Sequence, residues 1–213
     1  MNTFFITGIG TGVGKTVASA ILMQALQADY WKPVQSGYEE GTDADMVNSL
    51  VTHPGCRVFP STYTLRLPAS PHIAARLEGI RISLDNIQKD YLDIRNQSKN
   101  VLIIEGAGGL MVPLNEDAFI LDLIQRLETE VILVSRNYLG SINHSLLTAK
   151  QLKSSGIRIR GWIFMDDFMQ YEDEISRWTD IPILGKIPLA ARLDAGFISA
   201  ASGLLSTQML TAP

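Results

Sequence analysis

The 213-residue sequence contains a single cysteine, Cys56, so a disulfide within one chain is excluded. Charged residues make up only 19%, the formal net charge is −4, and there is no basic patch or arm, so a nucleic-acid partner is not expected. The apolar runs are too short to span a bilayer, so a membrane partner is not expected either. The first residues, MNTFFITGIG, lack the basic start of a signal peptide. We therefore expect a protein of the reducing cytoplasm.

Neither a linker, an internal repeat nor a low-complexity tract interrupts the chain, and 46% of its residues are hydrophobic. The length fits one domain, 1–213, with a full core. The apolar patterns predict strands at 2–7, 30–34, 62–66, 100–105, 131–135, 160–165 and 183–184, and helices at 15–28, 43–52, 71–78, 83–98, 117–127, 140–155 and 168–178. This alternation predicts an α/β fold with a doubly wound, mostly parallel sheet flanked by helices. Such sheets bind ligands at the carboxyl ends of their strands.

A glycine-rich loop, GIGTGVGKT, follows the first strand directly. Its backbone can crowd N–H groups around a phosphate, while Lys15 can reach the terminal phosphates and the Thr16 hydroxyl can hold Mg²⁺. Ile9 stands where the usual spacing has its first glycine. The order of strand, loop and helix nevertheless favours a nucleoside-triphosphate site of P-loop NTPase type over an ordinary glycine-rich turn. Nucleotide contacts are predicted for Gly12, Val13, Gly14, Lys15, Thr16 and Val17.

Two polar motifs follow the second strand. In KPVQSG, Lys32 and Ser36 can both face the phosphate site, although a lysine at a strand end is more often a solvated surface charge. In GTDAD, a carboxylate can bind Mg²⁺, and the residues alone leave the choice between Asp43 and Asp45 open. The plain alternative is that Thr42 or Asp43 caps the next helix.

Two further motifs follow the buried strands later in the chain. EGAGG begins with Glu105, an acid that needs a cation at the end of an apolar strand, so a place beside Mg²⁺ is predicted. Its glycines let the backbone approach a ligand closely. Gly140 and Ser141 open a long helix whose free amides suit a carboxylate or phosphate, and an N-cap by Ser141 is compatible with that. His144 has no nucleophile to pair with, so no catalytic role is expected.

These motifs indicate chemistry that depends on MgATP, which two classes of protein perform. One is a ligase that activates a small molecule, and the other is a regulatory or partitioning ATPase of the cell-division and plasmid-segregation kind. The second class usually carries an extra lysine in the loop, where this chain has Gly10. A basic surface or a membrane-targeting tail is not evident. The ligase class is therefore favoured.

Taken together, seven motifs resemble the dethiobiotin synthetase family, the ATP-dependent ligases of biotin biosynthesis. They are TGIGTGVGKT (7–16), KPVQSG (32–37), TDA (42–44), ASPHIAA (69–75), EGAGG (105–109), LGSINHSLLTA (139–149) and GKIP (185–188). They keep their order and span most of the chain. The related amidotransferases of cobyrinate synthesis share the fold but need a glutaminase domain, for which this chain has no room.

The resemblance implies a three-step reaction. One amine of 7,8-diaminononanoate (7,8-diaminopelargonate) takes up CO₂, the carbamate attacks the γ-phosphate of ATP, and the second amine closes the ureido ring with release of phosphate. It assigns Lys15 to the phosphates and Lys32 to the carbamate and γ-phosphate. It also selects Asp43, the acid of the TDA motif, over Asp45. The remaining assignments are Thr16, Asp43 and Glu105 to Mg²⁺, and Thr11 and Ser36 to hydrogen bonds near the reacting groups.

The resemblance further implies a homodimer with two shared active sites. The substrate carboxylate would reach the helix start of the other subunit, at Gly140, Ser141, Ile142 and Asn143. Pro71 and Gly108, with Lys32 and Ser36, would line the substrate pocket.

One position departs from the family pattern. Met165 stands where the family often has an asparagine that reads adenine, and a methionine cannot donate and accept hydrogen bonds as an amide does. Base selectivity is therefore expected to be loose, or to rest on backbone groups near Gly185 and Pro188.

Overall fold

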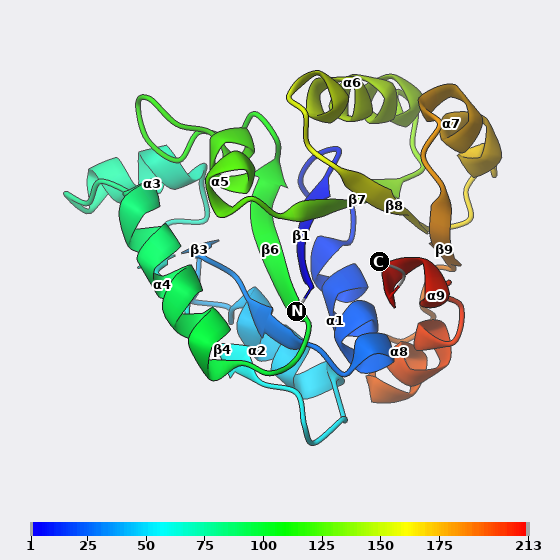
Figure 1. Cartoon of the computed structure of the whole chain (residues 1–213), viewed down its shortest axis with the longest axis horizontal. Helices are drawn as coiled ribbons and strands as arrows, with labels where there is room; N and C mark the ends of the chain where they lie inside the picture. The colour runs from blue at the N-terminus through cyan, green and yellow to red at the C-terminus, as the bar shows by residue number, and fades with distance from the viewer. Residues whose placement is uncertain (1, 212–213) are drawn as a thin grey trace.

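A seven-stranded sheet forms the centre of the computed structural model, in which residues 2–211 are described (Figure 1). In spatial order its strands are β4 (Val58–Phe59), β2 (Asp29–Trp31), β6 (Leu102–Gly109), β1 (Thr3–Gly8), β7 (Glu130–Arg136), β8 (Ile159–Met165) and β9 (Ile183–Ile187). Each neighbouring pair runs parallel. Strands β2, β4 and β6 lie on one side of β1, and β7, β8 and β9 lie on the other. The predicted doubly wound parallel sheet is therefore confirmed.

Helices cover both faces of this sheet (Figure 1). One face carries α1 (Lys15–Leu26), α2 (Asp43–Leu50), α8 (Ala195–Ser202) and α9 (Gln208–Thr211). The other carries α3 (Pro71–Leu77), α4 (Leu84–Gln97), α5 (Ile120–Leu127), α6 (Ser141–Ser154) and α7 (Glu172–Thr179). Among residues 2–211, no helix is long and apolar enough to cross a membrane.

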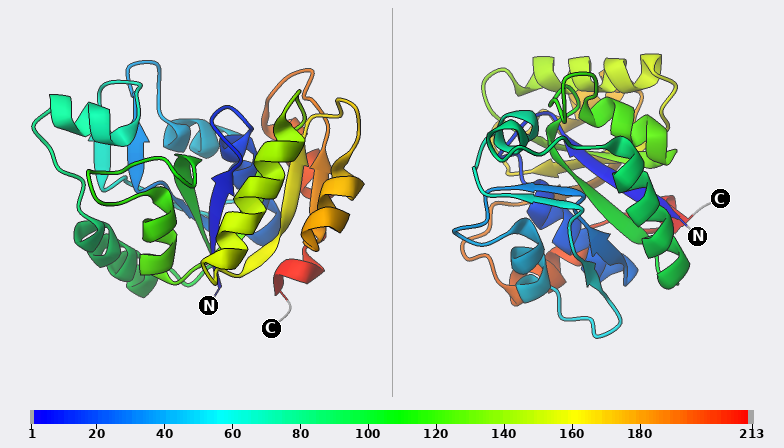
Figure 2. Two further views of the ribbon diagram at one scale, coloured as in Figure 1. Left: turned by 90° about the horizontal axis from the view of Figure 1, so that it is seen from above. Right: turned by 90° about the vertical axis from the view of Figure 1, so that its left-hand side faces the viewer.

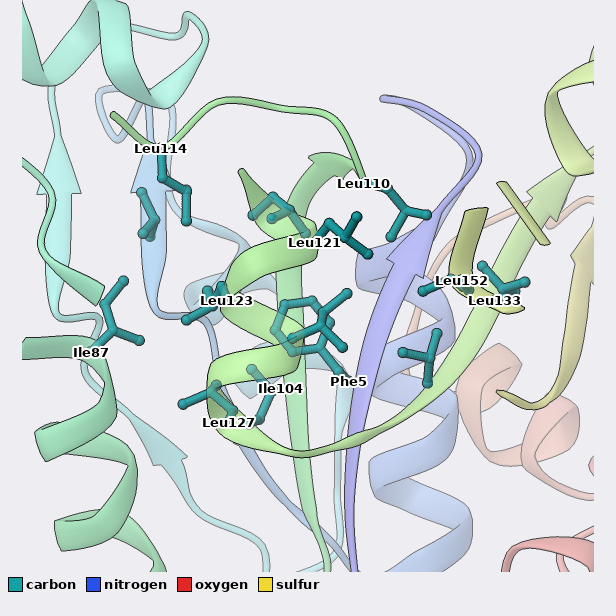
Figure 3. Close-up of a cluster of buried hydrophobic side chains, with 14 of the residues drawn as sticks. Phe5, Ile87, Ile104, Leu110, Leu114, Leu121, Leu123, Leu127, Leu133 and Leu152 are labelled. Carbon is teal, nitrogen blue, oxygen red and sulfur yellow. The ribbon is translucent and has the colours of Figure 1, made fainter. Parts of the chain in front are cut away.

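Each face of the sheet has its own hydrophobic core, because successive side chains of a strand point to opposite faces. Phe5 lies in the core beneath α4, α5 and α6, which Figure 3 shows with Ile104 of β6 and Leu123 of α5. Its neighbours Phe4 and Ile6 lie in the other core, against α1 and α8. Burial on both faces explains why the central strands are apolar throughout.

The predicted strand 30–34 is wrong as a single strand. Pro33 has no N–H to donate to a neighbouring strand, and the chain leaves the main sheet after Trp31. It resumes as β3 (Val34–Ser36), which pairs in parallel with β5 (Tyr63–Leu65) in a separate two-stranded sheet. This small sheet stands beyond one edge of the large one (Figure 2, left panel). The break places Lys32 between the two sheets.

Other differences concern the ends of elements. The two-residue β4 and the helices α8 and α9 were not predicted. The helices predicted at 117–127 and 168–178 begin later, at Ile120 and Glu172. Strand β6 continues to Gly109, so Glu105 lies within the strand and not at its end.

Candidate active site

The glycine-rich loop connects β1 to the first turn of α1. Gly12 and Gly14 have φ angles of 73° and 93°, in the left-handed region that disfavours residues with a Cβ. Ile9 explains the departure from the usual spacing: its N–H donates to Val134 O at 3.1 Å, and its side chain packs against the hydrophobic cores. The loop therefore does not require a glycine at that position. Its amides lie at the start of α1, where anions are favoured.

Lys15 is the first residue of α1 and folds back over the loop. Its Nζ donates to Gly10 O at 2.8 Å, and the residue is only 7% exposed. Burial, with a smaller contribution from the charge of Lys32, lowers the pKa of Lys15 to about 8, against the opposing influence of Glu105 and Asp43. The ammonium thus stands in a partly desolvated site, where its attraction to a phosphate is stronger than in water.

Lys32 joins the two carboxylates that the motifs singled out. Its Nζ lies 2.6 Å from Asp43 Oδ2 and 3.0 Å from Glu105 Oε1. Burial alone would lower the pKa of Lys32. The negative charges of Glu105 and Asp43 have a larger combined effect, and the pKa of Lys32 is raised. Burial likewise acts to raise the pKa of Asp43, and Lys32 outweighs it, so that this pKa is lowered. Lys32 and Asp43 therefore stay charged at neutral pH.

Thr16 stands beside both carboxylates. Its Oγ1 lies 2.5 Å from Asp43 Oδ1 and 3.0 Å from Glu105 Oε1. Within residues 2–211 no group of three or more His, Cys, Asp and Glu side chains could hold a metal ion by itself. One hydroxyl and two carboxylates are hard oxygen donors, and Mg²⁺ usually takes one or two carboxylates together with phosphate oxygens. The donors present fit a magnesium ion bound together with a nucleotide.

Asp43 and Asp45 have different environments, although the sequence could not separate them by residue type. Asp45 forms a capping box at the start of α2: its N–H donates to Thr42 Oγ1 at 3.0 Å, and its Oδ2 accepts from Thr42 N at 3.0 Å. Its side chain is committed to the helix start. Asp43, two residues earlier in the chain, contacts Lys32 and Thr16.

Two residues that were not predicted contact these acids, Tyr30 at the carboxylate of Glu105 and Gln35 at the backbone of Asp43. Tyr30 donates its hydroxyl to Glu105 Oε2 at 2.9 Å, and Gln35 Oε1 accepts the N–H of Asp43 at 3.3 Å. Burial, followed by the charge of Glu105, raises the pKa of Tyr30, so the hydroxyl stays protonated. A sequence signal for Tyr30 existed: it stands two residues before Lys32, on the same face of an extended segment.

A cleft of about 710 Å³ opens above these groups. Its lining includes most of the residues predicted to act in the site, namely Thr11, Gly12, Gly14, Lys15, Thr16, Val17, Lys32, Ser36, Asp43, Glu105 and Gly108. Val13 is buried beneath the loop. The Oγ of Ser36 is buried without a hydrogen-bond partner among residues 2–211. A buried hydroxyl of this kind is available to a ligand.

Pro71, Gly185 and Pro188 were also predicted as site residues, and they lie outside this lining. The cleft wall near the ASPHIAA motif consists of Pro68, Ala69 and Ser70, whereas Pro71 is buried one residue further on, as the first residue of α3. Gly185 is buried within β9, where an added Cβ would stand 2.6 Å from a side-chain carbon of Leu205. Pro188 is exposed just beyond the end of that strand.

The start of α6 lies apart from the cleft, at the end of β7. Gly140 has a φ of 104° and precedes the helix. The Ser141 hydroxyl is buried and lies 2.5 Å from the hydroxyl of Tyr171, and the Ser141 N–H donates to Tyr138 O. The Ser141 side chain is therefore occupied within its own chain. The amides of Ile142 and Asn143 lie in the first helical turn, where no preceding helical carbonyl can accept from them.

Met165 ends β8 directly beneath the loop. It is 8% exposed, and a Cβ added to Gly14 would lie 2.9 Å from Met165 Cγ. The methionine thus supports the underside of the phosphate-binding loop. The next residue, Asp166, has a φ of 79° and accepts from Arg136 Nε at 3.1 Å.

Comparison with known proteins shows the family to which the chain belongs. Residues 2–196 match the protein family described as an AAA domain. The ATP-dependent dethiobiotin synthetase BioD of Christiangramia forsetii is 48% identical over 87% of this chain and 86% of its own length. The protein of the same name from Rhodopseudomonas palustris (strain BisB18) is 45% identical over 92% of this chain and 91% of its own. The chain belongs to the dethiobiotin synthetase family.

Solved structures show how widely this fold is used. The superposition on the ParA family ATPase of Chlorobium tepidum covers 99% of each chain, with a TM-score of 0.60 and 15% sequence identity. The superposition on the MinD cell division protein of Aquifex aeolicus covers 94% of this chain and 87% of that protein, with a TM-score of 0.60 and 14% sequence identity. At such identities the likeness shows the fold alone. Membership of the dethiobiotin synthetase family decides between the ligase and the partitioning ATPase.

Proposed function

We propose that the protein, acting as one domain, joins CO₂ to the two amines of 7,8-diaminononanoate to form dethiobiotin, with conversion of ATP to ADP and phosphate. The family supports the overall reaction, because its relatives are named ATP-dependent dethiobiotin synthetases. The observation that carries the assignment to this site is the meeting of Lys15, Lys32 and two carboxylates with the phosphate-binding loop in one cleft.

The chemistry proceeds in three steps. One amine adds to CO₂ and loses a proton, which gives a carbamate. A carbamate oxygen then attacks the γ-phosphorus, and the bond to the ADP oxygen breaks, which leaves a carbamic–phosphoric anhydride. The second amine attacks the carbamoyl carbon, the bond from that carbon to the phosphate oxygen breaks, and the ureido ring closes with loss of a proton.

The residues of the cleft meet the main physical requirement of this sequence. The carbamate and the triphosphate are both anionic, so they approach each other only where cations and N–H donors neutralise them. Lys15 stabilises charge on the transferring phosphoryl group, and Lys32 holds the carbamate beside it. Ser36, whose hydroxyl has no partner of its own among residues 2–211, and Thr11 donate hydrogen bonds to the reacting groups.

Magnesium is the cofactor of this proposal, with ATP as co-substrate. Thr16, Asp43 and Glu105 would hold the ion, which supplies Lewis-acid neutralisation of the phosphate oxygens. The close grouping of their oxygens around Thr16 Oγ1 supports this donor set. Asp45 is not part of it, because its carboxylate is used by the capping box of α2.

We also propose a homodimer in which the substrate tail reaches the other subunit. The amides of Ile142 and Asn143 suit a carboxylate because they lie at a helix N-terminus. Ser141 contributes its backbone position and not its hydroxyl, which Tyr171 occupies. Pro71 shapes the pocket from behind, through the loop 68–70 that lines the cleft.

A mixing experiment tests the shared site. Lys15→Met disables the phosphate site, and Asn143→Pro removes an amide at the start of α6, so each variant alone should be nearly inactive. When the two are unfolded together and refolded, about half of the dimers are mixed, and each keeps one intact composite site if a site draws on both subunits. The rate of dethiobiotin formation should then recover to about a quarter of wild type. A mixture as inactive as its components, or an active monomer in sedimentation, contradicts the shared site.

Selectivity for the base forms a separate prediction. Met165 packs under the loop and offers no amide to a base, so we expect ATP, GTP and CTP to support turnover within about tenfold of one another. Backbone groups near Gly185 and Pro188 are the alternative source of selectivity. Rates with the three nucleotides, measured side by side, check this. A preference for ATP above a hundredfold refutes loose selectivity.

Product analysis tests the function as a whole. The enzyme is incubated with 7,8-diaminononanoate, bicarbonate and MgATP, and the cyclic urea is sought by mass spectrometry. The product should form only in the complete mixture and in step with ADP. If ATP were hydrolysed equally well without the diamine and no cyclic urea appeared, the protein would not have this function.

A further inference from the structure

The side chain of Tyr30 makes one polar contact within residues 2–211, and that contact is with a residue of the active site. It lies on β2, is fully buried, and its hydroxyl is 2.9 Å from Glu105 Oε2. The other oxygen of this carboxylate, Oε1, lies 3.0 Å from both Thr16 Oγ1 and Lys32 Nζ. The two oxygens of Glu105 thus have separate partners: a hydroxyl in the core for Oε2, and the groups of the cleft for Oε1.

We propose that Tyr30 is a positioning residue. Its hydroxyl holds Oε2 and thereby fixes the carboxylate of Glu105 with Oε1 toward Thr16, which strengthens magnesium binding with the nucleotide. This inference rests on the proposed role of Glu105 beside Mg²⁺. Partners that orient a metal-binding carboxylate by hydrogen bonds typically change metal affinity by about 10- to 100-fold when they are removed.

Packing explains the ring of Tyr30 but not its hydroxyl. The ring lies in the core shared with α1 and α2, where a phenylalanine fills the same space. A buried hydroxyl is unfavourable there unless it is hydrogen-bonded, and its partner is the carboxylate of Glu105. Trp31, the next residue, lies in the opposite core, and its Nε1 donates to Pro60 O. Residues two apart in an extended segment point to the same face, so Tyr30 and Lys32 both reach the carboxylate of Glu105.

The test separates binding of the metal from binding of the nucleotide. The affinity for the non-hydrolysable analogue AMPPNP is measured by calorimetry, once with excess Mg²⁺ and once with EDTA. In Tyr30→Phe the affinity with Mg²⁺ should weaken about tenfold, and the affinity in EDTA should change by less than about twofold. A packing defect would weaken both affinities alike, and equal weakening, or none, overturns the proposal.

Two further variants complete the design. Tyr91→Phe removes a hydroxyl that donates to Thr3 Oγ1 at 3.3 Å, away from Glu105, and should leave both affinities unchanged. Glu105→Gln should reduce the gain in affinity that Mg²⁺ provides; if it does not, the role of Glu105 itself is wrong, whatever Tyr30 does. In the Glu105→Gln background, Tyr30→Phe should cause no additional loss with Mg²⁺. A full tenfold loss there shows that the hydroxyl does not act through Glu105.

Discussion

Lys15→Met should lower the rate of dethiobiotin formation by about 10³-fold while the protein remains folded. The ammonium sits in a buried site at the start of α1, where one charged donor to a transferring phosphoryl group contributes strongly. The affinity for MgATP should fall less than the rate, because the loop amides and the helix start still bind the phosphates. Single-turnover kinetics and calorimetry measure the two effects separately.

The same substitution should stabilise the protein in the absence of ligands. Burial lowers the pKa of Lys15 from 10.5 to about 8, so the folded state disfavours its charged form. Below pH 8 this penalty is fully present, and it disappears as the pH rises toward 10.5, where the lysine is neutral in both states. Lys15→Met should therefore be more stable than wild type in urea at pH 7, and the difference should shrink by pH 10. A variant less stable at pH 7 contradicts this account of the site.

Lys32→Met should abolish turnover and also weaken the fold. It removes the cation that lies between Asp43 and Glu105, and leaves two carboxylates beside one threonine hydroxyl. Breaking a buried ion pair costs about 3–5 kcal/mol, and we expect about 2–3 kcal/mol here because the Asp43 side chain is 27% exposed. The rate should fall by about 10³-fold.

The loss of stability in Lys32→Met should depend on pH. In wild type the pKa of Asp43 lies below the ordinary 3.8 and that of Lys32 above 10.5, so their pairing contributes fully between these values. In the variant a carboxylate can take up a proton as the pH falls, which relieves the repulsion. The difference from wild type in urea unfolding should thus be larger at pH 8 than at pH 5. Lys153→Met, which removes a lysine that donates to Thr179 O at the far side of α6, serves as the control. A deficit that is independent of pH contradicts the pairing.

Much of the site could be predicted from the sequence because its parts come from short local motifs. The loop that ends in Lys15 and Thr16 follows a strand and opens a helix, and local order alone indicates its ligand. Glu105 stands in a run too apolar for a free acid, which signals a nearby cation. Lys32 was weaker as a prediction, because an isolated lysine carries no information about its partners.

The rest depended on contacts between distant segments. The capping box of Asp45 and the contacts of Asp43 separated two acids that look alike in the chain. In the sequence, Tyr30 looks like an ordinary strand residue. Only the pairing of β2 with β6 brings its hydroxyl to Glu105. Ser141 was predicted as part of an anion site formed by the amides of a helix start, and the contact of its hydroxyl with Tyr171, thirty residues away in sequence, could not be foreseen. The break at Pro33 was visible in sequence, yet its consequence, a second small sheet, was not.

We propose that two lysines and a divalent cation bring a carbamate oxygen into contact with the γ-phosphate. Turnover with ¹⁸O-labelled bicarbonate tests this contact directly, provided that labelled CO₂ stays in excess throughout the reaction. The attacking carbamate oxygen leaves with the phosphate, so each phosphate released should carry one ¹⁸O atom, which mass spectrometry detects. Phosphate that carries no label from bicarbonate, and takes its new oxygen from water, would show that the carbamate does not attack the γ-phosphate.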